Sequence, residues 1–153
     1  MNNPVKNPST PSLFGRVSLG YVVVESRKLP EWRRFAHEGL GLHVDAMGEQ
    51  ALAMRIDDHQ LRLLVREGAA EDVVAFGWQL DGDQALQLAL ARLRAAGIEV
   101  RDITGAEAAE RGVERLWAFT GPKRLRFELF TRPLVGTGPL AMRASGFVTG
   151  TMG

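Results

Sequence analysis

The three histidines are the first residues in this sequence that could do chemistry. His37 and His43 are six residues apart across the expected end of a helix, so their side chains cannot share one helical face. His59 follows Asp57 and Asp58, and such a group could bind a metal ion in a turn. The same polar residues are typical of a solvated hairpin tip, and we interpret them as a tip in preference to a metal site.

No further motif indicates a catalytic site. The sequence has no cysteine, which excludes disulfides, thiolate metal sites and a cysteine nucleophile. It also lacks an HExxH zinc motif, a GxSxG nucleophile elbow and the glycine-rich phosphate loops GxGxxG and GxxxxGK. The basic run at residues 123–126 alternates with an apolar residue, and we interpret it as the solvated face of a turn that enters a strand.

The composition is that of one globular domain. The 153 residues are 45% hydrophobic and 24% charged, and 19 Lys and Arg against 18 Asp and Glu leave a net charge of +1. This balance argues against a nucleic-acid or membrane-surface partner. No apolar run reaches the roughly 18 residues of a membrane span, and the N-terminus lacks a secretory signal. We therefore expect a soluble, cytoplasmic protein.

The hydrophobic pattern of the first half predicts a strand, a helix and three further strands. The β-branched run at 18–24 is typical of a buried strand, and Pro30 marks the first turn of a helix that ends near residue 40. The later strands are predicted at 42–45, 51–56 and 60–65, with a hairpin turn at 57–60.

The same order returns after residue 68. A strand at 73–80 precedes a helix that Asp83 caps and Gly97 ends. A short strand at 98–101 follows, and then a capping box at 104–107 opens one or two helical turns. Two strands, at 114–120 and 124–131, complete this half.

The two halves predict an α+β fold built from two βαβββ modules, at about residues 17–67 and 71–132 of a domain spanning 17–133. A four-stranded sheet cannot easily cover both of its faces. We therefore expect the modules to pair into one open, curved, mixed sheet around a common cavity. Residues 1–16 are expected to form a flexible arm, and residues 134–153 a linker.

Several strings of the sequence resemble the type I extradiol ring-cleaving dioxygenases, the relatives of 2,3-dihydroxybiphenyl 1,2-dioxygenase. The resemblance covers about residues 17–150, and its strings are those at 18–26, 32–42, 75–78, 109–113, 125–130 and 146–150. One departure is the turn at 121–124, which reads Gly-Pro-Lys-Arg where the family more often has Asp-Pro-Asp-Gly-Asn.

The resemblance implies the glyoxalase/bleomycin resistance/dioxygenase fold of the vicinal oxygen chelate superfamily. It also implies a two-domain enzyme whose second domain holds Fe(II) through two histidines and a glutamate and opens a catechol ring with O₂. This chain is similar to the first domain, which usually holds no metal. The positions equivalent to metal ligands are Tyr21, Leu64, Ala75 and Glu128, and only Glu128 suits a hard divalent metal. We therefore expect no catalytic residue, metal or cofactor in this chain.

Residues 146–150 resemble the bridge into the second domain of the family. We therefore expect a structural role beside a C-terminal catalytic domain of the same chain, in a homo-oligomer that degrades catechol-type aromatic hydrocarbons.

A stand-alone binding protein of the bleomycin-resistance type is the alternative. It would sequester an aromatic ligand in the cavity, with stacking surface from Tyr21, Phe76, Trp78 and Trp117. Core packing of these side chains is the interpretation that we favour. A glyoxalase-like metalloenzyme would need ligands at Tyr21, Leu64 or Ala75, and these residue types do not supply them.

Overall fold

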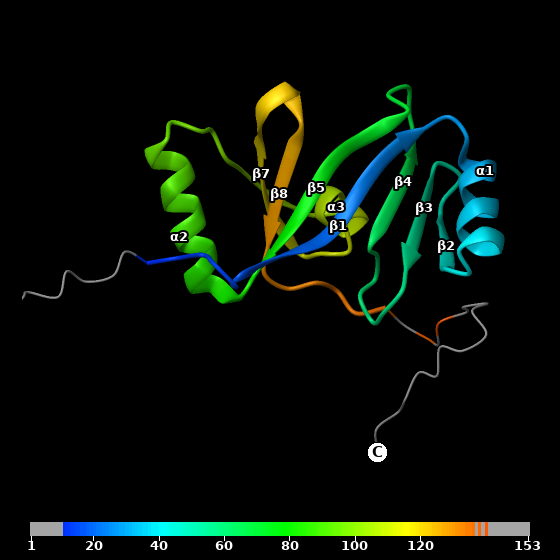
Figure 1. Cartoon of the computed structure of the whole chain (residues 1–153), viewed down its shortest axis with the longest axis horizontal. Coiled ribbons are helices and arrows are strands. Elements are labelled where there is room, and N and C mark those ends of the chain that lie inside the picture. Colours follow the sequence, from blue (N-terminus) through cyan, green and yellow to red (C-terminus); the bar gives the residue numbers. More distant parts are fainter. Residues whose placement is uncertain (1–10, 137, 139, 141–153) are drawn as a thin grey trace, which may run out of the picture.

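Two consecutive βαβββ units make up the chain in the computed structural model, which describes residues 11–136, 138 and 140 (Figure 1). The first unit contains β1 (Val17–Ser26), α1 (Leu29–Arg34), the π-helical segment η1 (Phe35–Gly39), β2 (His43–Met47), β3 (Ala51–Arg55) and β4 (Leu63–Glu67). The second contains β5 (Asp72–Leu80), α2 (Gly82–Ala95), β6 (Arg101–Thr104), α3 (Ala106–Glu110), β7 (Arg115–Thr120), the 3-10 turn η2 (Pro122–Arg124) and β8 (Arg126–Phe130). Among the helices of the described residues, none is long and apolar enough to cross a membrane.

All eight strands form one open mixed sheet in the order β2-β3-β4-β1-β5-β8-β7-β6. The pairs β1–β4 and β5–β8 are parallel, whereas the remaining neighbours are antiparallel. The antiparallel pairing of β1 with β5 joins the two modules at the centre of the sheet. The predicted α+β class with a single mixed sheet is therefore confirmed.

The helices divide between the two faces of the sheet. We call the face covered by α1 and α2 the outer face, since the buried side chains of these helices pack there on the first and the second module. The opposite, inner face carries a third apolar cluster, which includes Tyr21, Leu64 and Ala75 and which Ala108 of α3 completes. Beside this cluster, a pocket of about 730 Å³ lies between the modules, lined by residues of the first module and by α3 of the second.

Three local predictions for the second module were wrong. Its first short strand, β6, lies at 101–104 instead of 98–101, because the amide of Ile98 donates to the carbonyl of Leu93 and closes α2. The predicted capping box does not form, since Glu107 pairs with Arg126 and Gly105 is the N-cap of α3. Asp83 does not cap α2 either, because Asp81 is the N-cap residue.

The two ends of the described chain are docked on the domain. Residues 11–16 belong to the predicted flexible arm, yet Leu13 packs with the cluster under α2 and Arg92 donates to the carbonyl of Pro11. Residues 133–136 include the start of the predicted linker and pair with both modules. The amide of Leu134 donates to Gly112, and that of Gly136 donates to Asp58. The remaining residues of both predicted segments, apart from 138 and 140, lie outside the described part of the chain.

The seam between β1 and β5 requires glycine at two places. A β-carbon on Gly77 would overlap the ring of Tyr21, and one on Gly20 would overlap the ring of Phe130. Gly20 also lies at an irregularity of the β1–β5 register, between Leu19 opposite Trp78 and Tyr21 opposite Gly77. Because neither glycine has a side chain, the rings of Tyr21 and Phe130 can stack with centroids 5.3 Å apart.

Replacement of Gly77 by alanine should destabilise the domain. The new methyl group would overlap the ring of Tyr21, which is 2% exposed and has little room to move. Overpacking of this kind costs about 1–3 kcal/mol. Urea denaturation of Gly77→Ala would measure the loss. Gly39→Ala is the matched control, because its β-carbon would meet only a ring carbon of Phe35 at 3.6 Å. Equal losses in the two variants would contradict this account of the seam.

Candidate functional site

The four positions equivalent to metal ligands lie on the inner face of the sheet, each on a different strand. Val23 of β1 is opposite both Leu64 of β4 and Ala75 of β5, and it shares its face with them. In the neighbouring row Tyr21 is opposite Gly77, which in turn is opposite Glu128 of β8. All four positions are buried, with exposures of 0% for Leu64 and Glu128, 1% for Ala75 and 2% for Tyr21.

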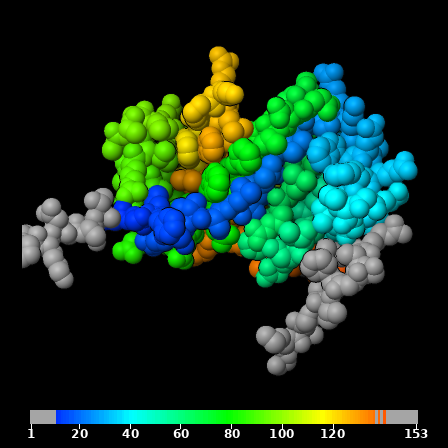
Figure 2. Space-filling model, viewed as in Figure 1, coloured from blue at the N-terminus to red at the C-terminus, as the bar shows by residue number. Residues whose placement is uncertain are grey.

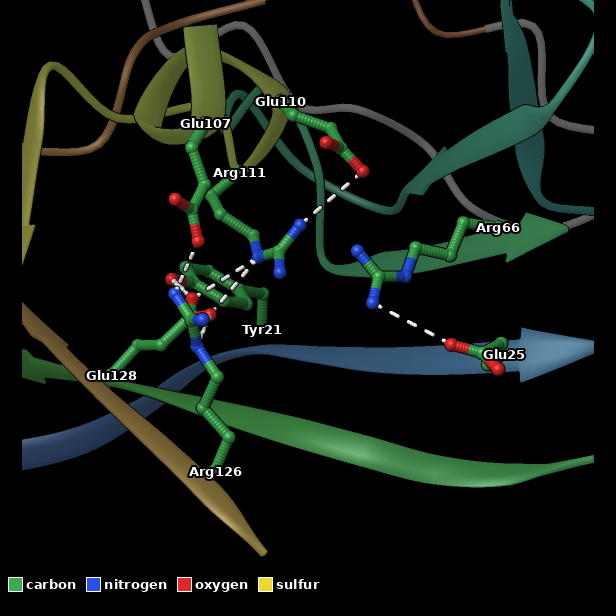
Figure 3. Close-up of polar contacts among 8 residues, drawn as sticks. All are labelled: Tyr21, Glu25, Arg66, Glu107, Glu110, Arg111, Arg126 and Glu128. Atoms are coloured by element: carbon green, nitrogen blue, oxygen red, sulfur yellow. Dashed lines mark hydrogen bonds and ion pairs between the residues drawn. The ribbon is translucent and has the colours of Figure 1, made fainter. Parts of the chain in front are cut away.

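Glu128 is the centre of a buried polar cluster on this face (Figure 3). The hydroxyl of Tyr21 donates a short hydrogen bond to Oε2 of Glu128. The Nε of Arg111 lies 3.1 Å from both carboxylate oxygens, and the Nε of Arg126 donates to Oε1 at 2.9 Å. Both oxygens of a fully buried carboxylate are therefore satisfied, which removes most of the cost of burying its charge.

The cluster continues as a chain of alternating charges. Arg126 also donates through Nη2 to Oε1 of Glu107 at 2.5 Å, while Nη1 of Arg111 forms an ion pair with Glu110 at 3.3 Å. Figure 3 shows these side chains arranged around Glu128 from α3, β1 and β8. Arg111 follows α3 directly and is itself only 3% exposed, so this short helix brings a positive charge to the interior.

The pKa of Tyr21 is raised well above its ordinary value of 10.0. Burial is the largest cause, followed by the negative charge of Glu128 and the hydrogen bond to it, whereas the charges of Arg111 and Arg126 act in the opposite direction. The phenol therefore stays protonated and serves as a hydrogen-bond donor. A neutral phenol is a poor ligand for a divalent metal.

The residues at this site do not fit an iron ion. Leu64 and Ala75 offer no ligand atom, and the oxygens of Glu128 are occupied by the donors of Tyr21, Arg111 and Arg126. A two-histidine, one-carboxylate site needs three ligands that converge on open positions, and one carboxylate facing two guanidinium groups does not provide them. No step of iron chemistry is assigned to these residues.

The four aromatic residues considered for ligand stacking do not converge. Tyr21 is on the inner face, whereas Trp78 and Trp117 are both opposite Leu129 and pack under α2 on the outer face. Phe76 is also on the outer face, tilted against Phe127 with ring centroids 6.2 Å apart. Three of the four aromatic residues thus lie on the outer face, whereas Tyr21 lies on the inner face.

The histidines also lie apart. His37 is in η1, and His43 of β2 contacts the carboxylate of Asp45 at 2.9 Å. His59 is in the loop between β3 and β4 with Asp57 and Asp58, and their ligand atoms lie within 4.8 Å of one another. Asp57, however, accepts two hydrogen bonds from Arg62. The loop joins the antiparallel strands β3 and β4, as the predicted hairpin requires, and the backbone of His59 also pairs with Val135.

Sequence reasoning missed the two arginines of the cluster. Residues 123–126 were interpreted as a solvated face, but the side chain of Arg126 is only 26% exposed and is bound to two carboxylates. Its spacing of two residues from Glu128 was an available signal, since residues i and i+2 of a strand share a face. The contact of Arg111 with Glu128 depends on how α3 packs, and no local pattern indicates it.

Loss of the charge on Glu128 should strongly destabilise the protein. In Glu128→Gln the guanidinium of Arg111 stays buried without its carboxylate, and removal of one member of a buried ion pair costs about 3–5 kcal/mol. Asp102→Asn is the matched control. Its partner Arg115 binds it through two nitrogens at the surface, where solvent screens the ion pair and its net contribution to stability is small. Urea unfolding curves would contradict the assignment if both variants lost the same free energy.

The protonation of Tyr21 should make stability depend on alkaline pH. Its pKa is higher in the folded than in the unfolded chain, so its contribution is complete below about pH 10 and falls by about 1.4 kcal/mol per unit above it. Since this is the sole tyrosine, absorbance at 295 nm reports its ionisation alone. We expect a transition near pH 10 in the urea-unfolded protein and none there in the folded protein. Tyr21→Phe should lose the extra pH slope, and a folded-state transition near pH 10 would overturn the prediction.

Comparison with known proteins identifies relatives of this site-bearing domain. A family model described as dihydroxybiphenyl dioxygenase BphC D1 matches residues 19–68. The 3-methylcatechol 2,3-dioxygenase of Pseudomonas putida (strain F1) is 36% identical over 143 residues, which cover 88% of this chain and 47% of that protein. The biphenyl-2,3-diol 1,2-dioxygenase of Sphingomonas paucimobilis is 31% identical over 140 residues, with the same two coverages.

Solved structures agree with these sequence matches. The structure of BphC, a halotolerant catechol dioxygenase, has a TM-score of 0.75 and 32% identity, and the match covers 82% of this chain and 42% of that one. Homoprotocatechuate 2,3-dioxygenase from Arthrobacter globiformis, at 22% identity and a TM-score of 0.71, shares the fold. This chain spans about half the length of the curated relatives it matches. The chain is therefore homologous to the N-terminal half of the type I extradiol ring-cleaving dioxygenases.

Proposed function

We propose that this chain is a metal-free structural domain of an extradiol dioxygenase that cleaves a catechol-type aromatic with Fe(II) and O₂. The observation that carries the proposal is the set of side chains at the four ligand-equivalent positions. One carboxylate is present there, and two guanidinium groups and a protonated phenol already bind it. The proposed iron chemistry belongs to a separate catalytic domain.

Arg111 has the role in this domain that a cation would have beside the carboxylate. Its guanidinium neutralises Glu128 from the end of α3, and its Nε–H, shared between the two carboxylate oxygens at 3.1 Å, links that helix to the inner face. The cluster thereby holds α3, β1 and β8 together without a ligand. A rigid domain of this kind suits a scaffold against which a second domain packs.

The proposed partner is a C-terminal catalytic domain, and the support is the partial coverage of the relatives. The matches span 47% of the two curated dioxygenases named above. One further relative, 30% identical over 115 residues, is named an iron-dependent extradiol dioxygenase, from Rhodococcus jostii. These names support a role in the breakdown of catechol-type aromatics. Assembly into a homo-oligomer and a cytoplasmic location stay predictions.

The alternative of a stand-alone protein that sequesters an aromatic ligand has less support. It requires stacking surfaces that face one cavity, whereas Phe76, Trp78 and Trp117 are on the outer face. The inner face carries an apolar cluster around Tyr21 and Leu64, and none of the four aromatic residues lines the pocket of about 730 Å³ between the modules.

This chain should bind no stoichiometric iron and should not cleave catechols by itself. After incubation with Fe(II) under nitrogen and desalting, we expect less than about 0.1 iron per chain by plasma mass spectrometry, because one engaged carboxylate cannot complete a site. With 2,3-dihydroxybiphenyl and air, no yellow ring-opened product should form.

Glu128→Gln is the control for this experiment, and because it is expected to be less stable, it is compared at a temperature at which circular dichroism shows it to be folded. Residual iron that is unchanged in the variant is bound at the surface and leaves the proposal intact. One iron per chain that is lost in Glu128→Gln, together with turnover of the diol, would overturn it.

A further inference from the structure

A cleft of about 540 Å³ opens at the edge of the second module, beyond the cluster around Glu128. Its walls come from the segment before β6, from β7 and from the turn and strand that follow it. Arg101 is opposite Ala118, and Ala118 is opposite Glu128, so these residues share the inner face of the sheet. The cleft therefore extends the inner face toward the β6 edge of the sheet. The β7–β8 hairpin, which forms one wall of the cleft, projects from the edge of the molecule (Figures 1 and 2).

Three guanidinium groups line this cleft, from Arg101, Arg124 and Arg126. Arg126 is held in place by Glu128 and Glu107, which fixes the orientation of its planar group. Arg101 and Arg124 are exposed, and neither forms an ion pair with another residue in the part of the chain that the structure describes. Glu99 is the one carboxylate of the lining, so positive charge is in excess there.

The backbone of the turn at Arg124 is unusual for the residues that it carries. Lys123 and Arg124 are consecutive non-glycine residues with positive φ, at 58° and 60°. This region disfavours residues with a β-carbon, and such conformations recur at binding and catalytic sites. The turn is held closed by hydrogen bonds from Leu125 to Pro122 and from Gly121 to Leu125. It brings the Arg124 side chain into the lining of the cleft.

The remaining lining sets the kind of molecule that fits. Ile98 and Ala118 provide a small apolar surface, and Thr120 provides a hydroxyl. Guanidinium groups bind carboxylate and phosphate oxygens through paired, charge-assisted hydrogen bonds. A small molecule that carries an oxyanion on an apolar body matches both properties.

We propose that this cleft binds a small oxyanion-bearing molecule through Arg101, Arg124 and Arg126. The site is separate from the iron chemistry proposed for another domain and goes beyond the structural role of this one. Of the three guanidinium groups, those of Arg101 and Arg124 take no part in the buried cluster, so variants of these two residues leave Arg126 and the cluster unchanged.

The test is a titration of the ¹⁵N-labelled chain with sodium phosphate and, separately, with sodium benzoate. Ionic strength is kept constant with sodium chloride so that general screening does not change. Saturable shifts of the backbone amides of Arg101, Thr120 and Leu125 are expected with at least one of the two anions. Saturation by phosphate alone assigns a phosphate ligand, and saturation by benzoate alone assigns a carboxylate. Either result supports the shared oxyanion chemistry.

The double variant Arg101→Gln/Arg124→Gln should weaken binding at least about tenfold, since each hydrogen bond to a charged group contributes substantially to affinity. The matched control is Arg33→Gln with Arg94→Gln, which removes the same charge from exposed positions of α1 and α2. It should leave binding unchanged. All four arginines are exposed, so both double variants should keep the wild-type urea midpoint. Shifts that do not saturate with either anion, or equal weakening in both variants, would overturn the proposal.

Discussion

The antiparallel pairing of β1 with β5 is the constraint on which the rest of the domain depends. It unites two four-stranded sheets, each of which has one face that its own helix leaves open. The strands can approach closely at the inner face because Gly20 and Gly77 leave room for the rings of Phe130 and Tyr21. This approach carries the Tyr21 hydroxyl across β5 to Glu128 on β8, so the packing of the seam also determines the polar cluster.

The burial of Glu128 is tolerated because its donors come from different parts of the second module and from β1. An isolated ionised carboxylate in a protein interior is costly, and its usual response is to take up a proton. Here Arg111 and Arg126 supply the compensating charge, and Glu110 and Glu107 in turn anchor those arginines. Each charged group of the cluster has a partner of opposite sign within the cluster. The cluster therefore links α3, β1 and β8, and none of its charges needs an external ion.

The sequence was sufficient to predict the order of elements and the fold class, because hydrophobic periodicity and turn residues are local signals. It also predicted that only Glu128, among the ligand-equivalent positions, carries a carboxylate. The orientation of Phe76 and Trp78 was available too, since they alternate along the strand with Ala75, which the resemblance gave as a ligand-equivalent position. The contact of Arg111 with Glu128 was not predictable, because it follows from the packing of α3 onto the finished sheet. The shift of β6 to residues 101–104 has a local cause, since the hydrogen bond from Ile98 to Leu93 that closes α2 removes Ile98 from the strand.

The two modules carry different residue types at the corresponding positions of their last strands, β4 and β8. Leu64 is opposite Val23 in the parallel pair β1–β4, and Glu128 is opposite Gly77 in the parallel pair β5–β8, so the two residues hold corresponding positions. The first module fills its position with an apolar side chain. The second fills it with a charge, and α3, inserted between β6 and β7, brings the arginine that this charge requires. At the ligand-equivalent positions of this chain, leucine and alanine thus stand beside one carboxylate, and the guanidinium groups of Arg111 and Arg126 supply the positive charge that this carboxylate requires.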